Sequence, residues 1–363
     1  MLSRINKIRD SIFNQKLDAL FITNQHNITY LTNFSGLAPN EREGFFFLTS
    51  QNSYLLTFPT YFGLYEKGGD GFSTLNITQT KKISDHISEI IQKENLKTVG
   101  FEKENLTVAE LESLQNKLNI KLISTEGIVE KFRLVKDDNE ISAIKIAAKV
   151  TDMAFDFIKT KVKKSVSEKE LALDLEFFLK KNADDIAFSP IVAFNENAAI
   201  PHYLPDNRKQ LTDNSLILLD FGAKVNGYCA DMTRVVFFGK PKNHWLTIYN
   251  TVLQAQKLAL EKLRANVAAN SIDKIARDYI TSKGFPQYPH GLGHGVGLAI
   301  HEAPRLRIDS KDILKENMAV TVEPGIYLPG DCGVRIEDLV LLKDRGIEIL
   351  SKSPKLLKDS IIL

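Results

Sequence analysis

The first third of the chain alternates between hydrophobic patterns typical of helices and patterns typical of strands. Helices are predicted over residues 2–15, which are mostly polar, over residues 83–92, where isoleucines recur at helical spacing, and over residues 108–118. Short apolar runs typical of strands occur over residues 19–22, 28–31, 44–48, 54–58, 98–101 and 121–124. Helices and strands that alternate over such a length predict an α/β domain, which we place at residues 1–128.

A charged, turn-rich segment over residues 130–140 follows, and we place the domain boundary near it. Asp137 or Asp138 then suits the N-cap of a long helix, because a capping carboxylate accepts a hydrogen bond from the first turn. A second domain is expected over residues 135–363. Its helices are predicted over residues 168–179, 244–263 and 271–281, and its strands over 216–220, over 228–238 and near the end of the chain.

The composition excludes several classes of protein. The 363 residues carry 47 Lys and Arg against 45 Asp and Glu, and no basic block marks a nucleic-acid binder. No apolar run reaches the roughly 18 residues of a membrane span, and no apolar signal core follows Met1. Two cysteines, Cys229 and Cys332, suit a reducing compartment. We therefore expect a cytoplasmic protein without nucleic-acid or membrane partners.

Two aspartates are predicted to share one face of a β-hairpin. Asn226-Gly227 lies between two runs of strand-forming residues, which is the strongest short signal of a hairpin turn. With this pair as the turn, Asp220 lies opposite Thr233, unless a bulge shifts the register. Side chains alternate with period two, so Asp231 lies on the same face as Asp220, roughly 7–8 Å from it as a diagonal neighbour.

A glycine-rich segment carries three of the seven histidines within twelve residues: His290, His294 and His301. Glycine lets the backbone and the side chains approach an ion or a ligand closely. A mobile loop or a phosphate-binding loop is the alternative, although no strand–turn–helix pattern frames these glycines.

Acidic residues in predicted strands also have simpler explanations. Asp220 ends an apolar strand, where a buried carboxylate is costly unless it binds a metal or pairs with a cation such as Arg234. Glu323 and Glu337 stand among strand-forming residues and are either surface acids or members of a site. Glu337 has a further possible partner in Arg335.

Together these segments supply two Asp, at least one His and two Glu. Four carboxylates brought close together would repel one another strongly without cations. A pair of divalent ions removes this repulsion, and oxygen-rich ligands with one imidazole suit Mn²⁺, Co²⁺, Fe²⁺ or Zn²⁺, of which we favour Mn²⁺. The chemistry implied is hydrolysis by a water activated between two metal ions.

These residues resemble the pita-bread metallopeptidases, above all the proline-specific aminopeptidase P and prolidase. The resemblance covers nearly the whole chain, because residues 27–36 resemble the creatinase-type N-terminal domain and the second half carries the ligand motifs. It implies an α/β N-terminal domain followed by an α+β pita-bread catalytic domain. The family's five metal ligands fall, in order, on Asp220, Asp231, His294, Glu323 and Glu337.

The resemblance also implies a role for each ligand. Asp231 and Glu337 would bridge the two ions, Asp220 would complete one site, and His294 with Glu323 would complete the other. Glu323 would also be the catalytic proton shuttle.

Further residues would bind the substrate around the scissile bond. His202 and His301 match histidines of the proline-specific members, and His301 would hydrogen-bond the substrate carbonyl. His290 would orient the residues of the site without binding metal itself, and Arg335 would support Glu337 or the substrate. Arg305 resembles a prolidase arginine that receives the carboxylate of a dipeptide, and its alternative is a surface arginine.

The expected reaction is cleavage between an N-terminal residue and a following proline. An Xaa-Pro aminopeptidase is favoured, and an Xaa-Pro dipeptidase (prolidase) is the alternative. The expected partners are small peptides with proline in second position and, by analogy with relatives whose N-terminal domains form dimers, a second copy of the chain. Methionine aminopeptidase usually lacks the N-terminal domain, and creatinase lacks these ligands. Some pita-bread domains only bind peptides, but no ligand position is lost here.

Overall fold

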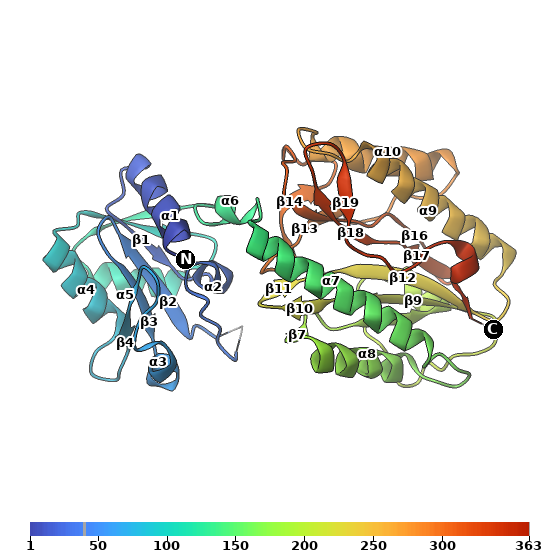
Figure 1. The fold of residues 1–363 in the computed structure, drawn as a ribbon, viewed down its shortest axis with the longest axis horizontal. Helices are drawn as coiled ribbons and strands as arrows, with labels where there is room; N and C mark the ends of the chain where they lie inside the picture. The colour runs from blue at the N-terminus through green and yellow to red at the C-terminus, as the bar shows by residue number, and fades with distance from the viewer. Residues whose placement is uncertain (39–40, 363) are drawn as a thin grey trace. The chain divides into compact units, whose positions relative to one another are not determined.

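A computed structural model describes residues 1–38 and 41–362 of the chain (Figure 1). It divides into two compact units, Met1–Arg133 and Leu134–Leu363. Among the described residues, none of the helices combines the length and the apolar character that crossing a membrane requires.

The first unit is built on one six-stranded mixed sheet with the strand order β4-β3-β2-β1-β5-β6. Its strands are β1 (Ala19–Ile22), β2 (Gly44–Thr49), β3 (Ser53–Thr57), β4 (Ser73–Asn76), β5 (Thr98–Glu102) and β6 (Lys121–Thr125). Its helices are α1 (Leu2–Asn14), α2 (Gln25–Thr32), α3 (Pro59–Tyr65), α4 (Ile83–Glu94), α5 (Val108–Lys117) and α6 (Glu130–Arg133).

Both faces of this sheet are covered at its centre. Phe45 and Phe47 of β2 pack with Ile87 and Ile90 of α4 in one apolar cluster. Phe46, which points to the opposite face, is also fully buried. Burial on both faces explains why β2 is a continuous apolar run and not an alternating one.

The strand predicted over residues 28–31 is wrong, because these residues belong to α2. Asn24 caps this helix by accepting a hydrogen bond from the backbone N–H of Asn27 (3.2 Å). Asn33 ends it in the left-handed conformation, with φ 57°. A short apolar run fits either element, and here the two capping asparagines decide for the helix. The sequence pattern also gave no sign of the edge strand β4.

The second unit places its sheets between two helical pairs, α7 with α8 and α9 with α10 (Figure 1). The helices are α7 (Asp138–Lys159), α8 (Glu168–Asn182), α9 (Asn243–Lys262) and α10 (Ala269–Ser282). As expected, Asp137 caps α7: its carboxylate accepts from the backbone N–H of Glu140, whose carboxylate accepts from that of Asp137 (both 3.0 Å).

The strands of the second unit form a four-stranded sheet, a five-stranded sheet and two smaller ones. The four-stranded sheet has the order β20 (Ile361–Ile362), β12 (Met232–Phe238), β9 (Ser215–Phe221), β8 (Ile191–Phe194). The five-stranded sheet has the order β14 (Glu302–Leu306), β13 (Gly293–Gly295), β15 (Ala319–Val322), β18 (Asp338–Leu342), β19 (Ile347–Ile349). The smaller sheets are β11 (Tyr228–Cys229), β10 (Ala223–Val225), β7 (Asp185–Ile186) and the pair β16 (Gly325–Leu328), β17 (Cys332–Arg335).

One apolar core joins α9 to both larger sheets. Trp245 and Tyr249 of α9 belong to the same buried cluster as Leu218 of β9 and Val320 of β15. This core fixes α9 behind the strand ends that carry the acidic residues described below.

Replacing Leu218 with alanine should lower the free energy of unfolding of the second unit by about 2–5 kcal/mol, because it leaves a cavity in this core. Urea unfolding followed by the fluorescence of Trp245, the single tryptophan, reports on this unit. The control is Leu173→Ala on α8, whose side chain is half exposed, with an expected change of roughly 0.5 kcal/mol or less. Equal losses in the two variants would contradict the prediction.

Candidate metal centre

The β-hairpin that carries Asp220 and Asp231 has the register predicted from its turn. Asp220 of β9 lies opposite Thr233 of β12, with no bulge between them. Asn226 and Gly227 both have positive φ, at 50° and 80°, as a two-residue hairpin turn requires. The two aspartates therefore share one face of the hairpin.

The other candidate ligands come from the strands that face this hairpin. His294 lies at the centre of β13, Glu323 directly follows β15, and Glu337 lies between β17 and β18. The glycines that flank His294 are required by close packing. A Cβ on Gly293 would lie 2.0 Å from the carbonyl oxygen of Thr321, and a Cβ on Gly295 would lie 2.1 Å from that of Ala303.

The candidate ligands converge in overlapping groups whose nitrogen and oxygen atoms lie within 4.8 Å of one another. These groups are Asp220 with Asp231 and Glu337, His294 with Glu323 and Glu337, and Asp231 with His294 and His301. Glu337 belongs to the first two groups, so it lies between two neighbouring sets of donors. The Nε2 atom of His294 is 3.4 Å from Oε1 of Glu323 and 3.6 Å from Oδ2 of Asp231.

Divalent cations fit this cluster of donors. Oδ1 of Asp220, Oδ1 of Asp231 and Oε1 of Glu337 are buried and accept no hydrogen bond from any described residue. Burial, followed by repulsion from neighbouring carboxylates, raises the pKa of both Asp231 and Glu337 well above the usual range. Burial also raises the pKa of Glu323 to about 8. Buried carboxylate oxygens without partners are costly, and metal coordination satisfies them.

The histidine of the cluster is suited to binding as a neutral ligand. Burial, with a smaller contribution from the charge of His301, lowers the pKa of His294 to about 3. A neutral imidazole presents a lone pair, which is the form that a metal ion binds.

Arg335, and not Arg234, is the cation that meets Asp220. Its Nη2 atom lies 2.6 Å from Oδ2 of Asp220, and its Nε donates to the hydroxyl of Thr233 (3.0 Å). That hydroxyl donates to Oε2 of Glu337 (2.7 Å), so Arg335 reaches Glu337 through Thr233. Arg234 points elsewhere and pairs with Asp338 at 2.7 Å. The sequence analysis offered Arg234 to Asp220 and Arg335 to Glu337, and the structure instead pairs Arg335 with Asp220.

A cavity of about 430 Å³ opens beside this cluster, and every site residue predicted from the sequence lines it. His301 packs edge-on against His294, with ring centroids 4.4 Å apart. His202 is exposed at the cavity, and Arg305 and Arg307 also lie on its wall.

His290 lies in the cavity wall, where aromatic residues hold it. It stacks on Tyr288 at 5.1 Å, and its Nε2 atom lies 2.8 Å from the hydroxyl of Tyr327. Burial lowers its pKa to about 4, so it is a neutral group that orients its neighbours. Tyr327 also accepts a hydrogen bond from Arg335 (2.8 Å), which links His290 to Asp220.

The sequence analysis missed several residues of this site. Phe188 and Ile191 form an apolar part of the wall, and Thr233 and Tyr327 connect the ligands. Thr233 was within reach, because the predicted register placed it opposite Asp220. Tyr327 gave no signal beyond a hydroxyl in an apolar strand.

Comparison with known proteins identifies the family. The model of metallopeptidase family M24 matches residues 142–344, and that of the creatinase/prolidase N-terminal domain matches residues 4–135. The chain belongs to metallopeptidase family M24. The predicted fold, a creatinase-type N-terminal domain followed by a pita-bread catalytic domain, is confirmed, and the family implies divalent metal ions.

This M24 metallopeptidase is similar to relatives over nearly its whole length. The uncharacterized peptidase YqhT of Bacillus subtilis strain 168 is 33% identical over 97% of this chain and 98% of the relative. An Xaa-Pro dipeptidase structure from Bacillus anthracis has a TM-score of 0.93 and 36% identity, and covers 99% of each chain. An X-Pro aminopeptidase from Thermotoga maritima MSB8 has a TM-score of 0.86 and 31% identity, over 96% of this chain and 98% of that one.

A prolidase from Pyrococcus horikoshii OT3 has a TM-score of 0.89 and 31% identity, over 98% of this chain and 99% of that one. The chain is therefore a metallopeptidase whose similar solved structures include prolidases, which argues against the non-catalytic alternative.

Removing metal from this M24 metallopeptidase should make its stability fall as pH rises from about 7 to about 8. Glu323 has a pKa of about 8 in the fold and roughly 4.3 when unfolded. Between these values unfolding releases a proton, so a higher pH favours unfolding. Asp231 and Glu337 act in the same direction, because their pKa values are also raised. Below pH about 7 the buried histidines His290 and His294, whose pKa values are lowered, act in the opposite direction, because unfolding lets them bind a proton.

The measurement is the melting temperature of chelator-treated protein by calorimetry across this pH interval. Glu323→Gln removes one titrating group and should flatten the dependence. A melting temperature that rises with pH over the interval would contradict the prediction.

Proposed function

We propose that this M24 metallopeptidase is an Xaa-Pro dipeptidase, which hydrolyses dipeptides whose second residue is proline. The observation that carries the proposal is Arg305, which lines the cavity and has no side-chain ion pair with another described residue. Its charge acts within the site: after burial, Arg305 is the next cause of the lowered pKa of His301. A dipeptide carries its carboxylate directly behind the scissile bond, and a guanidinium binds a carboxylate through two parallel hydrogen bonds.

We propose the dipeptidase activity in place of the aminopeptidase activity that the sequence analysis favoured. Similar solved structures include an Xaa-Pro dipeptidase and prolidases with TM-scores up to 0.93. The X-Pro aminopeptidase from Thermotoga maritima remains a reason to keep the aminopeptidase as the second candidate.

The proposed metal ligands are Asp220, Asp231, His294, Glu323 and Glu337. Asp231 and Glu337 would bridge two ions, as the resemblance to the family implies. Both are carboxylates that belong to more than one donor group. When bound, the ions supply Lewis-acid activation of water and of the substrate carbonyl. We propose Mn²⁺, since the ligands are mostly oxygen with one imidazole.

The chain's own residues move the proton and bind the substrate. Glu323, whose Oε1 accepts from the hydroxyl of Thr321 (3.2 Å), takes a proton from the attacking water and passes it to the proline nitrogen. Neutral His301 donates a hydrogen bond to the carbonyl oxygen as negative charge develops there. His202 contacts the substrate at the cavity mouth, His290 orients the wall, and Arg335 holds Asp220 in place.

Other expectations from the sequence remain proposals. We propose that the protein acts on small peptides in the cytoplasm as a homodimer. We also propose residues 1–128 and 135–363 as the limits of its two domains.

The deciding experiment compares Ala-Pro with Ala-Pro-Ala as substrates of metal-stripped protein refilled with Mn²⁺. A dipeptidase should cleave Ala-Pro and leave the tripeptide intact, because the added residue displaces the carboxylate from Arg305. Asp231→Asn is the control for metal dependence and should lose the second ion and the activity. Cleavage of the tripeptide between Ala and Pro would instead establish the aminopeptidase. No turnover of either substrate with two ions bound would refute proline-specific hydrolysis.

Replacing Arg305 with methionine should raise the KM for Ala-Pro roughly 10- to 100-fold, because a hydrogen bond between charged groups contributes about 1.5–3 kcal/mol. The amide of Ala-Pro lacks the carboxylate, so its hydrolysis should respond little to the substitution. Arg307→Met is the matched control, because Arg307 lies on the same wall but already pairs with Asp309 (2.7 Å). Equal effects of Arg305→Met on both substrates would remove the assigned role of Arg305.

A further inference from the structure

The two glutamates of the centre face each other across a break in a strand pair. The antiparallel pairing of β15 with β18 ends at Val322 opposite Asp338, and that of β16 with β17 begins at Gly325 opposite Arg335. The two pairings share one register, so Glu323 and Glu337 would lie opposite each other inside the break.

Backbone hydrogen bonds do not close this break. The N–H of Glu323 donates to the carbonyl of Leu292 (2.7 Å), and the N–H of Glu337 donates to that of Thr233 (3.1 Å). The backbone of each glutamate is thus hydrogen-bonded to a different neighbouring segment. Pro324 has no N–H to offer, and only its carbonyl receives a long bond of 3.5 Å from Ile336.

Gln256 of α9 bridges the break from behind. Its side chain is fully buried on the apolar face of the helix, among residues of the core. Its Nε2 atom donates to the carbonyl of Val322 and to that of Ile336, both at 3.1 Å. These are the residues that directly precede Glu323 and Glu337, so one side-chain amide connects the backbone on both sides of the break.

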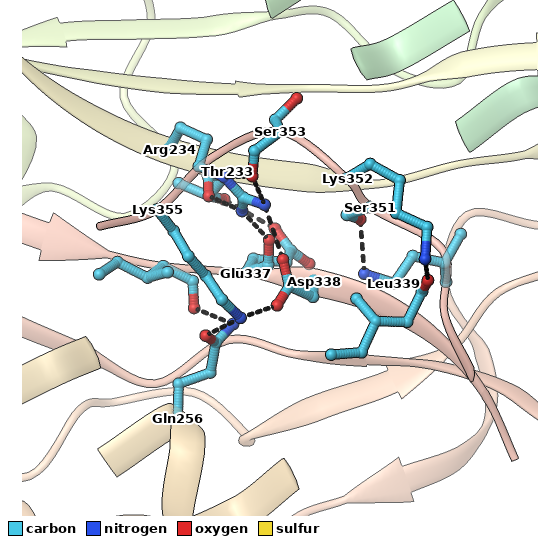
Figure 2. Close-up of polar contacts among 12 residues, drawn as sticks. Thr233, Arg234, Gln256, Glu337, Asp338, Leu339, Ser351, Lys352, Ser353 and Lys355 are labelled. Atoms are coloured by element: carbon cyan, nitrogen blue, oxygen red, sulfur yellow. Dashed lines mark hydrogen bonds and ion pairs between the residues drawn. The ribbon is translucent and has the colours of Figure 1, made fainter. Parts of the chain in front are cut away.

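A buried polar network fixes the direction of this amide (Figure 2). The ammonium of Lys355 donates to Oε1 of Gln256 (2.8 Å) and to the carboxylate of Asp338. A reversed amide would place its oxygen against two carbonyl oxygens and its NH₂ group against an ammonium. Only the orientation with the NH₂ group towards the two carbonyls satisfies the hydrogen bonds of these buried groups.

The same network also holds the backbone of Glu337. Asp338 pairs with Arg234 at 2.7 Å, and Arg234 donates to the carbonyls of Glu337 and Thr233 (Figure 2). The side chains of Arg234 and Asp338 are almost completely buried, so water does not compete for these bonds.

We propose that Gln256, oriented by Lys355, is a positioning residue that sets the spacing between Glu323 and Glu337. It touches neither substrate nor metal, and it acts through the two carbonyls that precede the glutamates. This inference rests on the proposed role of both glutamates as metal ligands. Residues that orient metal ligands typically change metal affinity about 10- to 100-fold when they are replaced.

The test measures Co²⁺ binding to metal-stripped protein by calorimetry and by the visible absorption spectrum of the bound ion. Gln256→Leu removes both N–H donors at similar size, and Gln256→Glu removes them while keeping an oxygen towards Lys355. Both variants should bind the weaker of two Co²⁺ ions about 10- to 100-fold less tightly, with a changed absorption spectrum. The matched control is Gln254→Leu on the same helix, whose half-buried side chain has no hydrogen bond to a described residue and should change neither.

The outcomes separate this inference from the proposed function. Two Co²⁺ ions in the unaltered protein, with unchanged affinity and spectrum in a folded Gln256 variant, would overturn the positioning role and leave the metal centre standing. Failure of the unaltered protein to bind two ions would overturn both. Should the Gln256 variants not fold, as judged by circular dichroism, Lys355→Met carries the test. It keeps the amide but frees its orientation, so it should weaken binding in the same direction, and unchanged binding would overturn the inference.

Discussion

The structure of the second unit is organised around four carboxylates that share one buried site. Asp220, Asp231, Glu323 and Glu337 lie around one cavity, and three of them have an oxygen without a hydrogen-bond partner among the described residues. Among the residues that the structure describes, Arg335 is the one cation bonded directly to them, and it cannot neutralise them all. Such a site is stable only when protons or metal ions neutralise the carboxylates. The backbone that carries them is held by hydrogen bonds from buried side chains outside the site.

The residues that hold this backbone lie outside the set of proposed metal ligands and substrate-binding residues. The helix α9 is packed into the core by Trp245 and Tyr249, and from that position its Gln256 reaches the strand ends. The network of Arg234, Asp338 and Lys355 joins the same region to the end of the chain. The carboxylates, which repel one another, are thus supported by a network of oppositely charged side chains. The two sets meet at Glu337, which lies among other carboxylates, and at the adjacent Asp338, which pairs with Arg234 and Lys355.

The sequence predicted several local parts of this arrangement, failed at one local choice between helix and strand, and failed where distant segments decide. The face shared by Asp220 and Asp231 followed from Asn226-Gly227, because a two-residue turn fixes the register of the strands it joins. The strand predicted over residues 28–31 was wrong because helix caps outweighed a short apolar run. Arg234 was the wrong partner for Asp220, because the pairing with Arg335 joins residues more than one hundred positions apart, which no local pattern contains. Gln256 gave no signal either, because its partners are backbone carbonyls of other segments.

The glycines beside His294 limit the substitutions that the chain can accept near the site. Neither Gly293 nor Gly295 offers a side chain to an ion or a peptide, yet any larger residue there would collide with the backbone of a neighbouring strand. Random mutagenesis scored by activity would therefore mark both positions as essential, alongside the groups that do chemistry. Inactivating mutations would thus fall on β13 as well as on the residues of the reaction centre. Close packing between strands limits which residues the sequence around His294 can contain.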